Sequence, residues 1–189
     1  MKKILDSELL LYPCPITLVT SQYNNSKNVL TVSWTGIASS HPEYVTISVK
    51  ATRYSYELIH KSGFFTINVI NKELLQKADY CGSHSGRNRN KFDDCGFSCV
   101  QGIHSNVPMI AECPVNIECS VIREINLGSH ILFLGKVLGK YVDEGIAIQN
   151  IHEQLSPVVY FRPNYYAVDS DILGSYGKMS MDVVDNTEK

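Results

Sequence analysis

The sequence is built around short runs in which apolar and polar residues alternate, and this period of two restricts the fold more than any other feature. Residues 44–50 and 64–70 show the alternation most clearly, as half-buried strands do. Gly135 and Gly139 interrupt a longer run of this kind and predict a bulge or bend within it. The further β-rich runs are residues 15–20, 28–34, 115–123, 130–142 and 158–161.

Helical patterns are fewer and shorter than the strand patterns. They cover residues 53–61 and 71–81 and, more weakly, residues 88–95 and 145–154. The polar residues 24–27 lie between two strand patterns and predict a hairpin. Because strands outnumber helices and do not alternate with them regularly, the sequence predicts a mainly β protein. We expect an antiparallel barrel with a few short helices rather than a doubly wound parallel sheet.

The composition is that of a globular chain without pronounced charge. Its 189 residues are 44% hydrophobic and 19% charged, with a formal net charge of −2. A nucleic-acid partner is disfavoured, because such proteins usually carry a broad basic surface. No apolar run approaches the roughly 18 residues of a membrane span, and residues 1–8 do not resemble a signal peptide. We therefore expect a single cytoplasmic domain over residues 1–189.

Six cysteines invite a disulfide or a zinc interpretation. Disulfide frameworks are typical of small secreted chains, which this sequence does not resemble. No two cysteines have two residues between them, and the closest pairs are Cys95/Cys99 and Cys113/Cys119. We expect reduced, mostly buried thiols and no metal site, with a cysteine-based zinc-binding module as the alternative.

The common sequence motifs for nucleotide binding and hydrolysis are absent. There is no Walker loop and no Gly-x-Gly-x-x-Gly after a strand, and residues 82–86 fail as a nucleophile elbow because His84 stands at their centre. Any nucleotide site must therefore be built differently. One candidate is residues 28–40, where a strand enters a small-residue loop that carries Trp34. Backbone amides there could approach a planar ligand, although an ordinary loop explains the pattern equally well.

Two further segments could bind an anion. Arg53 and Ser55 stand where a strand leads into a helix, a suitable place for a phosphate, although plain capping of the helix by Thr52 is the alternative. Residues 82–92 carry three cations within five positions, and this cluster indicates either an anion site or a solvated basic loop. The three cations are Arg87, Arg89 and Lys91.

Six segments in the same order carry a resemblance to a known family. They are residues 12–20, 28–40, 48–59, 65–69, 85–92 and 128–137. Together they resemble the flavin reductase-like family, specifically its flavoredoxin-type members. Ser129 stands where the family usually has Asp before His130, so the sequence departs from the family pattern at the position that would hold the reductant.

The resemblance implies a fold, a cofactor and a set of contacts. The fold is a Greek-key split β-barrel over about residues 10–168, with residues 169–189 as a tail or dimer arm. The implied cofactor is noncovalent FMN near the interface of a homodimer, and His130 and Tyr165 would lie on the nicotinamide path. The implied FMN contacts are Asn28, Thr31, Val32, Ser33, Trp34, Thr35, Ser48, Val49, Arg53, Tyr54, Ser55, Ser85 and Lys91.

The function that follows is an FMN-binding oxidoreductase, either an NAD(P)H-dependent flavin reductase or a flavoredoxin. NAD(P)H would reduce the flavin, and the electrons would pass to an acceptor protein or a flavin-dependent partner. The reaction demands no catalytic acid or base from the protein, because the cofactor carries the chemistry. A non-enzymatic FMN-binding electron carrier remains the alternative.

Overall fold

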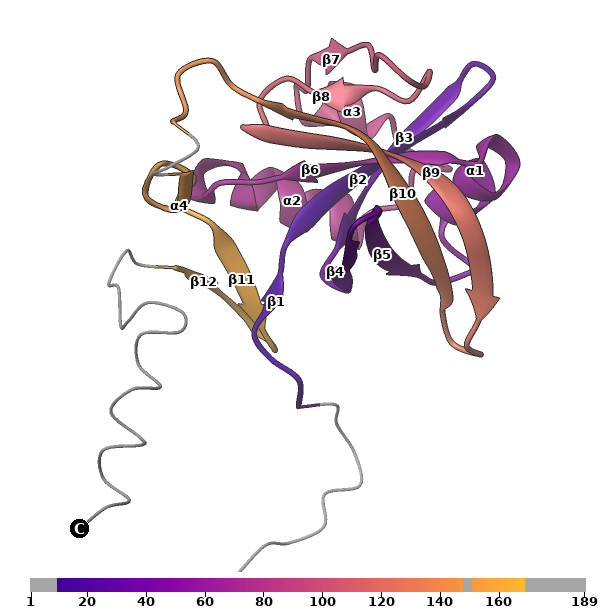
Figure 1. The fold of residues 1–189 in the computed structure, drawn as a ribbon, viewed down its shortest axis with the longest axis horizontal. Helices are drawn as coiled ribbons and strands as arrows, with labels where there is room; N and C mark the ends of the chain where they lie inside the picture. The colour runs from indigo at the N-terminus through magenta and orange to yellow at the C-terminus, as the bar shows by residue number, and fades with distance from the viewer. Residues whose placement is uncertain (1–9, 148–150, 169–189) are drawn as a thin grey trace, which may run out of the picture.

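A single antiparallel sheet of seven strands forms the body of the protein (Figure 1). The computed structural model describes residues 10–147 and 151–168. The strand order is β3-β2-β6-β9-β10-β5-β4, so several sheet neighbours are distant in the sequence, as in Greek-key barrels. The seven strands are β2 (Thr17–Tyr23), β3 (Ser26–Val32), β4 (Thr35–Ser40), β5 (Glu43–Val49), β6 (Phe64–Val69), β9 (Val115–Asn126) and β10 (Ile131–Val142).

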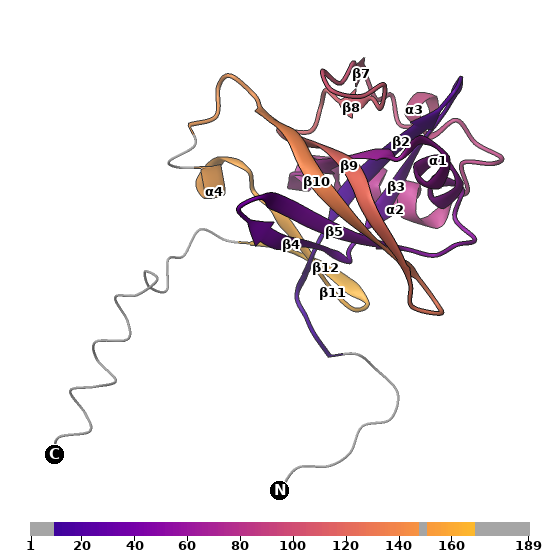
Figure 2. The same cartoon turned by 45° about the vertical axis from the view of Figure 1, so that its right-hand side comes forward.

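Two small sheets and a few short helices surround this body. One small sheet, in the order β1-β11-β12, lies to one side of the barrel in both views (Figures 1 and 2). Its strands are β1 (Cys14–Pro15), β11 (Val158–Phe161) and β12 (Asn164–Ala167), and the other small sheet pairs β7 (Cys99–Val100) with β8 (Met109–Ile110). The helices are α1 (Tyr54–Ser62), the 3-10 turn η1 (Lys72–Leu74), α2 (Leu75–Ser83), α3 (Lys91–Asp94) and α4 (Ile151–Gln154).

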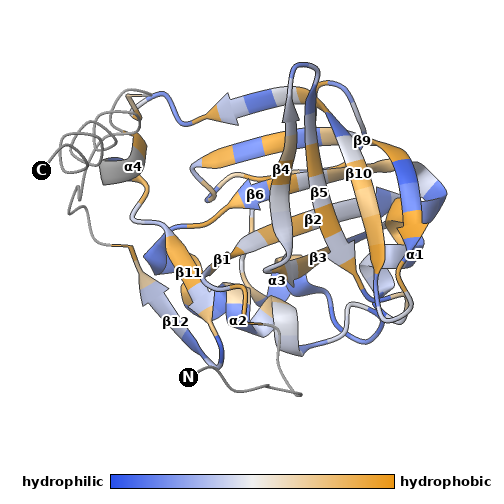
Figure 3. Ribbon diagram, turned by 60° about the horizontal axis from the view of Figure 1, so that its bottom comes forward, coloured by the Kyte–Doolittle hydropathy of each residue, from blue (hydrophilic) through white to orange (hydrophobic). Residues whose placement is uncertain are grey.

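Strands β2 and β3 separate two hydrophobic cores. Successive side chains of a strand point to opposite faces, so the pair Val19 and Leu30 faces the barrel interior with Phe65 and Phe133. The other face packs against α2 and α3 through the second core. The alternation appears as bands of opposite hydropathy along the strands in Figure 3. The site residues on β3 therefore stand on a strand that is buried on both sides.

The long β9–β10 hairpin bends where the sequence predicts it. The register between the strands shifts between Leu134 and Gly135 and again between Val137 and Gly139, which confirms the expected bulges. Gly135 has a steric reason as well. A Cβ atom there would lie 2.5 Å from Cζ of Phe65. Only a glycine therefore allows β10 to pass this close to the Phe65 ring.

The structure confirms the β2–β3 hairpin and the mainly β class but changes several boundaries. The loop expected after residue 34 is strand β4, which pairs with β5. The helix expected over 71–81 is divided into η1 and α2, and the one expected over 88–95 is reduced to α3. Of the helix expected over 145–154, α4 is described, whereas residues 148–150 and the tail 169–189 lie outside the described residues.

The described residues also bear on membranes, metals and thiols. No helix in the described ranges is long and apolar enough to cross a membrane. Within these ranges, no group of three or more His, Cys, Asp or Glu residues is placed to hold a metal ion. All six cysteines are free thiols, and four of them are buried. Burial raises the pKa of Cys113 and Cys119 to about 12, so these thiols are uncharged at neutral pH.

Candidate functional site

Most of the residues singled out from the sequence line two adjoining cavities beside β3. The larger, of about 510 Å³, is called the central groove here and is lined by residues 31–34, Ser48, Val49 and His130. The smaller, of about 340 Å³, is called the anion pocket and is lined by Asn28, Tyr54, Ser85 and Lys91. Leu30, Lys50 and Arg53 line both cavities, so the two form one continuous depression.

An aromatic pair forms one wall of the central groove. Trp34 lies between β3 and β4 with 43% of its surface exposed, and its ring centroid is 4.5 Å from that of His130. The Trp34 carbonyl accepts a 2.9 Å hydrogen bond from the Ser48 amide, which fixes the backbone of the wall. Burial and the nearby Lys50 lower the pKa of His130, so its imidazole is neutral at neutral pH. This wall of the groove thus offers a flat, uncharged surface to a planar ligand.

The N-terminus of α1 points into the anion pocket. The capping residue is Arg53, and it makes no side-chain hydrogen bond to the first turn, so the alternative interpretation, capping by Thr52, is wrong. The amides of a first helical turn carry partial positive charge and bind anions well when no side chain occupies them. Beneath this turn, the buried Asn28 amide donates a 2.9 Å hydrogen bond to the Ser55 hydroxyl. Strand β3 and helix α1 are therefore joined at the pocket floor.

Lys91 brings a positive charge into the same pocket from α3. Its side chain is only 2% exposed, and its ammonium group donates to the carbonyls of Val29 at 2.9 Å and Cys81 at 2.7 Å. A lysine ammonium has three N–H donors, so one donor remains. Burial lowers the Lys91 pKa, which indicates that an anion beside it would be stabilising. The solvated-loop interpretation is thus wrong for this residue.

Close contacts of two β3 side chains hold the rest of the walls of the two cavities. A Cβ atom at Gly86 would lie 2.0 Å from Oδ1 of Asn28, so the loop that carries Ser85 can approach β3 only through a glycine. The Thr31 hydroxyl donates to the Ala78 carbonyl of α2, which ties β3 to the helical layer. The Thr31 side chain therefore shapes the wall, and its hydroxyl is engaged within the protein.

The structure does not bring every expected residue to this depression. Thr35 lines a neighbouring cavity of about 440 Å³, which also touches Trp34 and Ser48. Tyr165, expected on the nicotinamide path, does not line the central groove; its phenol donates a 2.7 Å hydrogen bond to Asp79. Tyr160 lines the groove instead, with its ring centroid 5.5 Å from that of Tyr165.

Sequence reasoning also missed residues that the fold brings to the groove. Besides Tyr160 these are Tyr12, Lys50 and Arg162. The β11 strand was expected, but nothing in its sequence indicates that it lies near β3. Its place follows from the pairing of β1 with β11, in which Cys14 stands opposite Tyr160.

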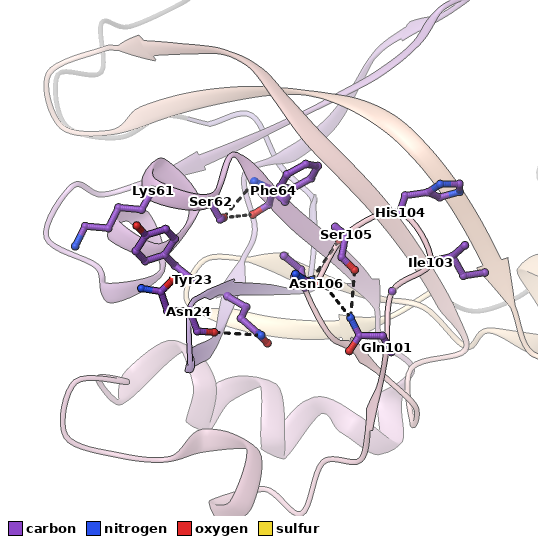
Figure 4. A pocket seen from close by; sticks show the side chains of 13 residues that line it. Tyr23, Asn24, Lys61, Ser62, Phe64, Gln101, Ile103, His104, Ser105 and Asn106 are labelled. Atoms are coloured by element: carbon purple, nitrogen blue, oxygen red, sulfur yellow. Dashed lines mark hydrogen bonds between the residues drawn. The ribbon is translucent and has the colours of Figure 1, made fainter.

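The largest cavity described lies elsewhere and contains none of the expected residues (Figure 4). It measures about 730 Å³ and lies between the β2–β3 turn, the end of α1 and the loop 101–107. Its one lysine, Lys61, is paired with Glu57 at 2.8 Å, and the loop backbone is turned inward toward the carboxylate of Glu118. We assign the functional site to the depression beside β3, where a helix N-terminus and a buried cation converge.

Comparison with known proteins places this architecture in a family. The chain matches the description "Flavin reductase like domain" over residues 9–169. It superposes on a flavoredoxin from Methanosarcina acetivorans with a TM-score of 0.90 and 26% identity, covering 97% of this chain and 99% of that one. A flavoredoxin of Desulfovibrio vulgaris (Miyazaki F) gives a TM-score of 0.85 and 31% identity, covering 95% and 100%.

Relatives in sequence agree with the structural neighbours. A protein of Archaeoglobus fulgidus is 33% identical over 74% of this chain and 77% of its own length. More distant relatives are an NADH-dependent FMN reductase of Streptomyces nodosus subsp. asukaensis, 24% identical over 76% and 77%, and an NADH-dependent FAD reductase of Streptomyces globisporus, 26% identical over 67% and 69%. With a domain match over most of its length, a split-barrel fold and a relative above 30% identity, this chain belongs to the flavin reductase-like family.

Proposed function

We propose that this protein is an FMN-binding oxidoreductase that passes electrons from NAD(P)H through FMN to an acceptor. The observation that carries the proposal is Lys91, a buried ammonium with one N–H donor left, placed in the same pocket as the α1 N-terminus. The family and its NADH-dependent flavin reductases support the same function. A flavoredoxin that exchanges electrons with a protein acceptor is included in this proposal.

The anion pocket fits the phosphate of FMN. Its donors come from two separate elements: α1 offers its first-turn backbone and the guanidinium of its capping residue Arg53, and α3 offers the ammonium of Lys91. A phosphate has only acceptor oxygens, and charged donors bind it most strongly. None of the described residues that line this pocket is an Asp or a Glu, so no carboxylate competes for these donors.

The central groove fits the flavin ring. Trp34, Ser48 and Val49 would lie along the ring, and the backbone of residues 31–35 would contribute amides at its edge. Bound FMN would supply the redox chemistry of the site, namely hydride transfer from a reduced nicotinamide and electron transfer onward to an acceptor. The protein's contribution is to orient the two partners and to exclude water, which can account for several of the ~7–11 kcal/mol available from orientation. The neutral His130 would face the nicotinamide side.

The cofactor part of the proposal is tested on the purified protein. We expect a yellow protein from which heat or acid releases a compound that comigrates with FMN. A colourless protein that also fails to take up added FMN would contradict the proposal at its centre.

The enzymatic part needs a separate measurement, because a non-enzymatic FMN-binding electron carrier would also be yellow. We expect anaerobic addition of NADH or NADPH to bleach the visible absorbance of the bound flavin. Dithionite serves as the control that the flavin can be reduced at all. If dithionite bleaches the flavin and neither nicotinamide does, the electron-carrier alternative is correct.

We also propose that the protein is a homodimer with the flavin site near the subunit interface. Exposed apolar side chains gather on β4 and on the β9–β10 hairpin, where Ile37 is 88%, Ile122 52% and Leu127 60% exposed. Burying such side chains favours association. The cytoplasmic location stays a prediction.

A further inference from the structure

One residue that lines the anion pocket, His84, is absent from the expected FMN contacts. It stands at the centre of residues 82–86, the segment that fails as a nucleophile elbow. It lines the pocket together with Arg53 and Lys91. The His84 ring is stacked on the Tyr80 ring, with the centroids 4.0 Å apart and the planes 21° from parallel, so its orientation is held by α2.

The hydrogen bonds of His84 determine which ring nitrogen carries the hydrogen in the neutral imidazole. Its Nδ1 lies 3.2 Å from the Tyr80 carbonyl oxygen and 3.0 Å from the Ser83 hydroxyl oxygen. A carbonyl oxygen only accepts, and the Ser83 hydroxyl has an acceptor of its own in the Asp79 carbonyl at 2.9 Å. All of these contacts are satisfied only if Nδ1 is the donor, so Nδ1 carries the hydrogen.

The other ring nitrogen, Nε2, is therefore an acceptor in the neutral ring. It makes no hydrogen bond to the described residues, because both hydrogen bonds that the ring makes there are at Nδ1. A phosphate dianion has only acceptor oxygens, so a neutral Nε2 cannot bind it. A protonated Nε2 is a donor on a cation, and such a group binds a phosphate strongly.

The cations of the anion pocket oppose a further positive charge while no anion is bound. They are Lys50, which follows β5, Arg53 at the cap of α1, and Lys91 of α3. Arg89 adds to this repulsion from the loop, since its charge acts on the Tyr80 phenol. The other titratable residue that lines the pocket is Tyr54.

The end of helix α2 favours a positive charge on the same ring. His84 is the capping residue at the C-terminus of α2, where the last carbonyls carry partial negative charge. The carboxylates on this side accept hydrogen bonds from phenols, Asp79 from Tyr165 and Asp94 from Tyr80. The imidazole thus stands between a helix end that favours a proton and a group of cations that opposes it, and a bound phosphate would decide between them.

We propose that His84 binds the FMN phosphate through a protonated Nε2, so that one proton is taken up from solvent with each FMN. The inference rests on the proposed function, because it takes the anion pocket as the place of the phosphate. Since binding takes up a proton, FMN is bound more tightly as the pH falls from about 8 to about 7. Riboflavin lacks the phosphate, and its binding does not depend on pH in this range.

The experiment measures proton uptake by titration calorimetry on the full chain freed of flavin. FMN and riboflavin are each titrated at about pH 7.5 in Tris and in HEPES, two buffers that differ in ionisation enthalpy. The difference in heat between the buffers gives the number of protons taken up. The second ionisation of a phosphate monoester lies near pH ~6, so free FMN is already a dianion and contributes little.

Three variants assign the proton to one atom. His84→Gln supplies an amide N–H donor in place of the protonated Nε2, and this donor needs no proton from solvent. His84→Asn retains a donor for the Tyr80 carbonyl but lacks an atom that corresponds to Nε2. His60→Gln is the control, since His60 is exposed, lies in the last turn of α1 and lines neither cavity. Thermal unfolding verifies that each variant is folded.

We expect wild type to take up about one proton with FMN and none with riboflavin. Its dissociation constant for FMN should rise about tenfold between about pH 7 and about pH 8, as linkage to one proton requires. His84→Gln should bind FMN without proton uptake and with a nearly constant affinity over this range. His84→Asn should lose the uptake and bind FMN about tenfold more weakly at about pH 7. His60→Gln should match wild type.

Three outcomes would overturn the inference while the proposed function stands. The first is FMN binding by wild type without proton uptake, which would leave His84 as a helix cap only. The second is an uptake that persists in His84→Gln, because that proton would belong to Lys91, whose pKa burial lowers. The third is an equal uptake with riboflavin, which would separate the proton from the phosphate. If wild type binds no FMN, the proposed function itself has failed.

Discussion

At the scale of residues, two buried charged groups stand out, the Lys91 ammonium and the Glu118 carboxylate. Among the described residues, each is stabilised by hydrogen bonds and not by an oppositely charged side chain. The Lys91 ammonium is bound by two backbone carbonyls, and the Glu118 carboxylate is bound by the amides of Ile103 and Ser105 and by the Tyr141 phenol at 2.6 Å. Backbone dipoles thus compensate for the water that each charge loses on burial. The two charges differ in one respect, because Lys91 faces a cavity with a donor to spare.

Lys91→Met should weaken FMN binding about ten- to a hundredfold, because hydrogen bonds to charged groups contribute about 1.5–3 kcal/mol. Met retains the apolar stem, but the Val29 and Cys81 carbonyls lose their donor, so a somewhat lower melting temperature is expected as well. Riboflavin lacks the phosphate, and its affinity should hardly change. Fluorescence titration of both flavins measures this; equal losses would show that Lys91 does not hold the phosphate.

Glu118→Gln should lower the free energy of unfolding by about 1–3 kcal/mol near neutral pH, because the amide satisfies fewer of the donors around it. Burial raises the Glu118 pKa, but the hydrogen bonds from Tyr141, Ser105 and the loop amides outweigh it and hold the pKa below its usual 4.5. The stabilisation is therefore present above that value and is lost as the pH falls through the folded-state pKa.

Urea unfolding of wild type and Glu118→Gln at several pH values measures this effect, and their difference should shrink below about pH 4.5. Glu43→Gln is the control, since Glu43 pairs with Lys140 at the surface and should contribute little at any pH. A difference that does not depend on pH would contradict the ionised state of Glu118.

The sequence named Lys91 as a phosphate candidate but could not reveal its surroundings. Its two acceptors, Val29 and Cys81, come from β3 and α2, and no local pattern indicates that these elements meet at α3. Tyr165 illustrates the same limit in the opposite direction. A family resemblance placed it on the nicotinamide path, whereas the pairing of β11 with β12 directs its phenol to Asp79 and leaves Tyr160 at the groove.

At the scale of elements, two features of the sheet determine where the site lies. They are the bent β10 strand and the junction between β3 and β4. The strands with clear period-two alternation were predictable from sequence, as were the bulges at Gly135 and Gly139. Strand β4 was not, because residues 35–40 are small and mostly exposed and so lack the alternation that marks a half-buried strand. Its pairing with β5 depends on tertiary structure.

Gly135→Ala should destabilise the protein by about 1–3 kcal/mol, the usual cost of overpacking a core. The added Cβ would meet Phe65 Cζ at 2.5 Å and Cys119 Cβ at 3.2 Å, within the barrel core. Gly36→Ala in β4 is the matched control, since its Cβ would meet nothing closer than Thr46 Oγ1 at 3.6 Å. The melting temperatures of both variants are measured by thermal unfolding, and that of Gly135→Ala should be the lower. Similar melting temperatures would argue against a steric role of Gly135.

Trp34→Ala should weaken FMN binding and change the visible spectrum of the bound flavin, because the indole and His130 form a wall of the central groove. The fold should be little affected, since Trp34 is 43% exposed. Ile103→Ala, 73% exposed and outside the central groove, is the control and should leave both properties unchanged. An unchanged spectrum in Trp34→Ala would place the flavin ring elsewhere.

At the scale of the whole molecule, the two cores share β2 and β3, so the barrel and the helical layer are parts of one packed unit. The anion pocket lies at the boundary between them, with Asn28 on the barrel side and Lys91 on the helical side. A substitution that loosens the packing of either core should therefore also weaken phosphate binding in the anion pocket.

The homodimer should appear as a particle of about twice the chain mass of 21.2 kDa in light scattering. The physical reason is the exposed apolar side chains of Ile37 on β4 and of Ile122 and Leu127 on the β9–β10 hairpin. The measurement is made with and without added FMN. A stable monomer with full flavin occupancy would contradict the proposed dimer.

The uneven burial of the cysteines also provides a place for a spectroscopic reporter. Cys99 is exposed and Cys14 half-buried, whereas the other four thiols are enclosed and resist alkylation. A maleimide dye should therefore attach first at Cys99, whose sulfur accepts a hydrogen bond from Lys27 of β3, the strand that lines the candidate site. Such a label would report the arrival of a nucleotide in real time, without reliance on the colour of the flavin.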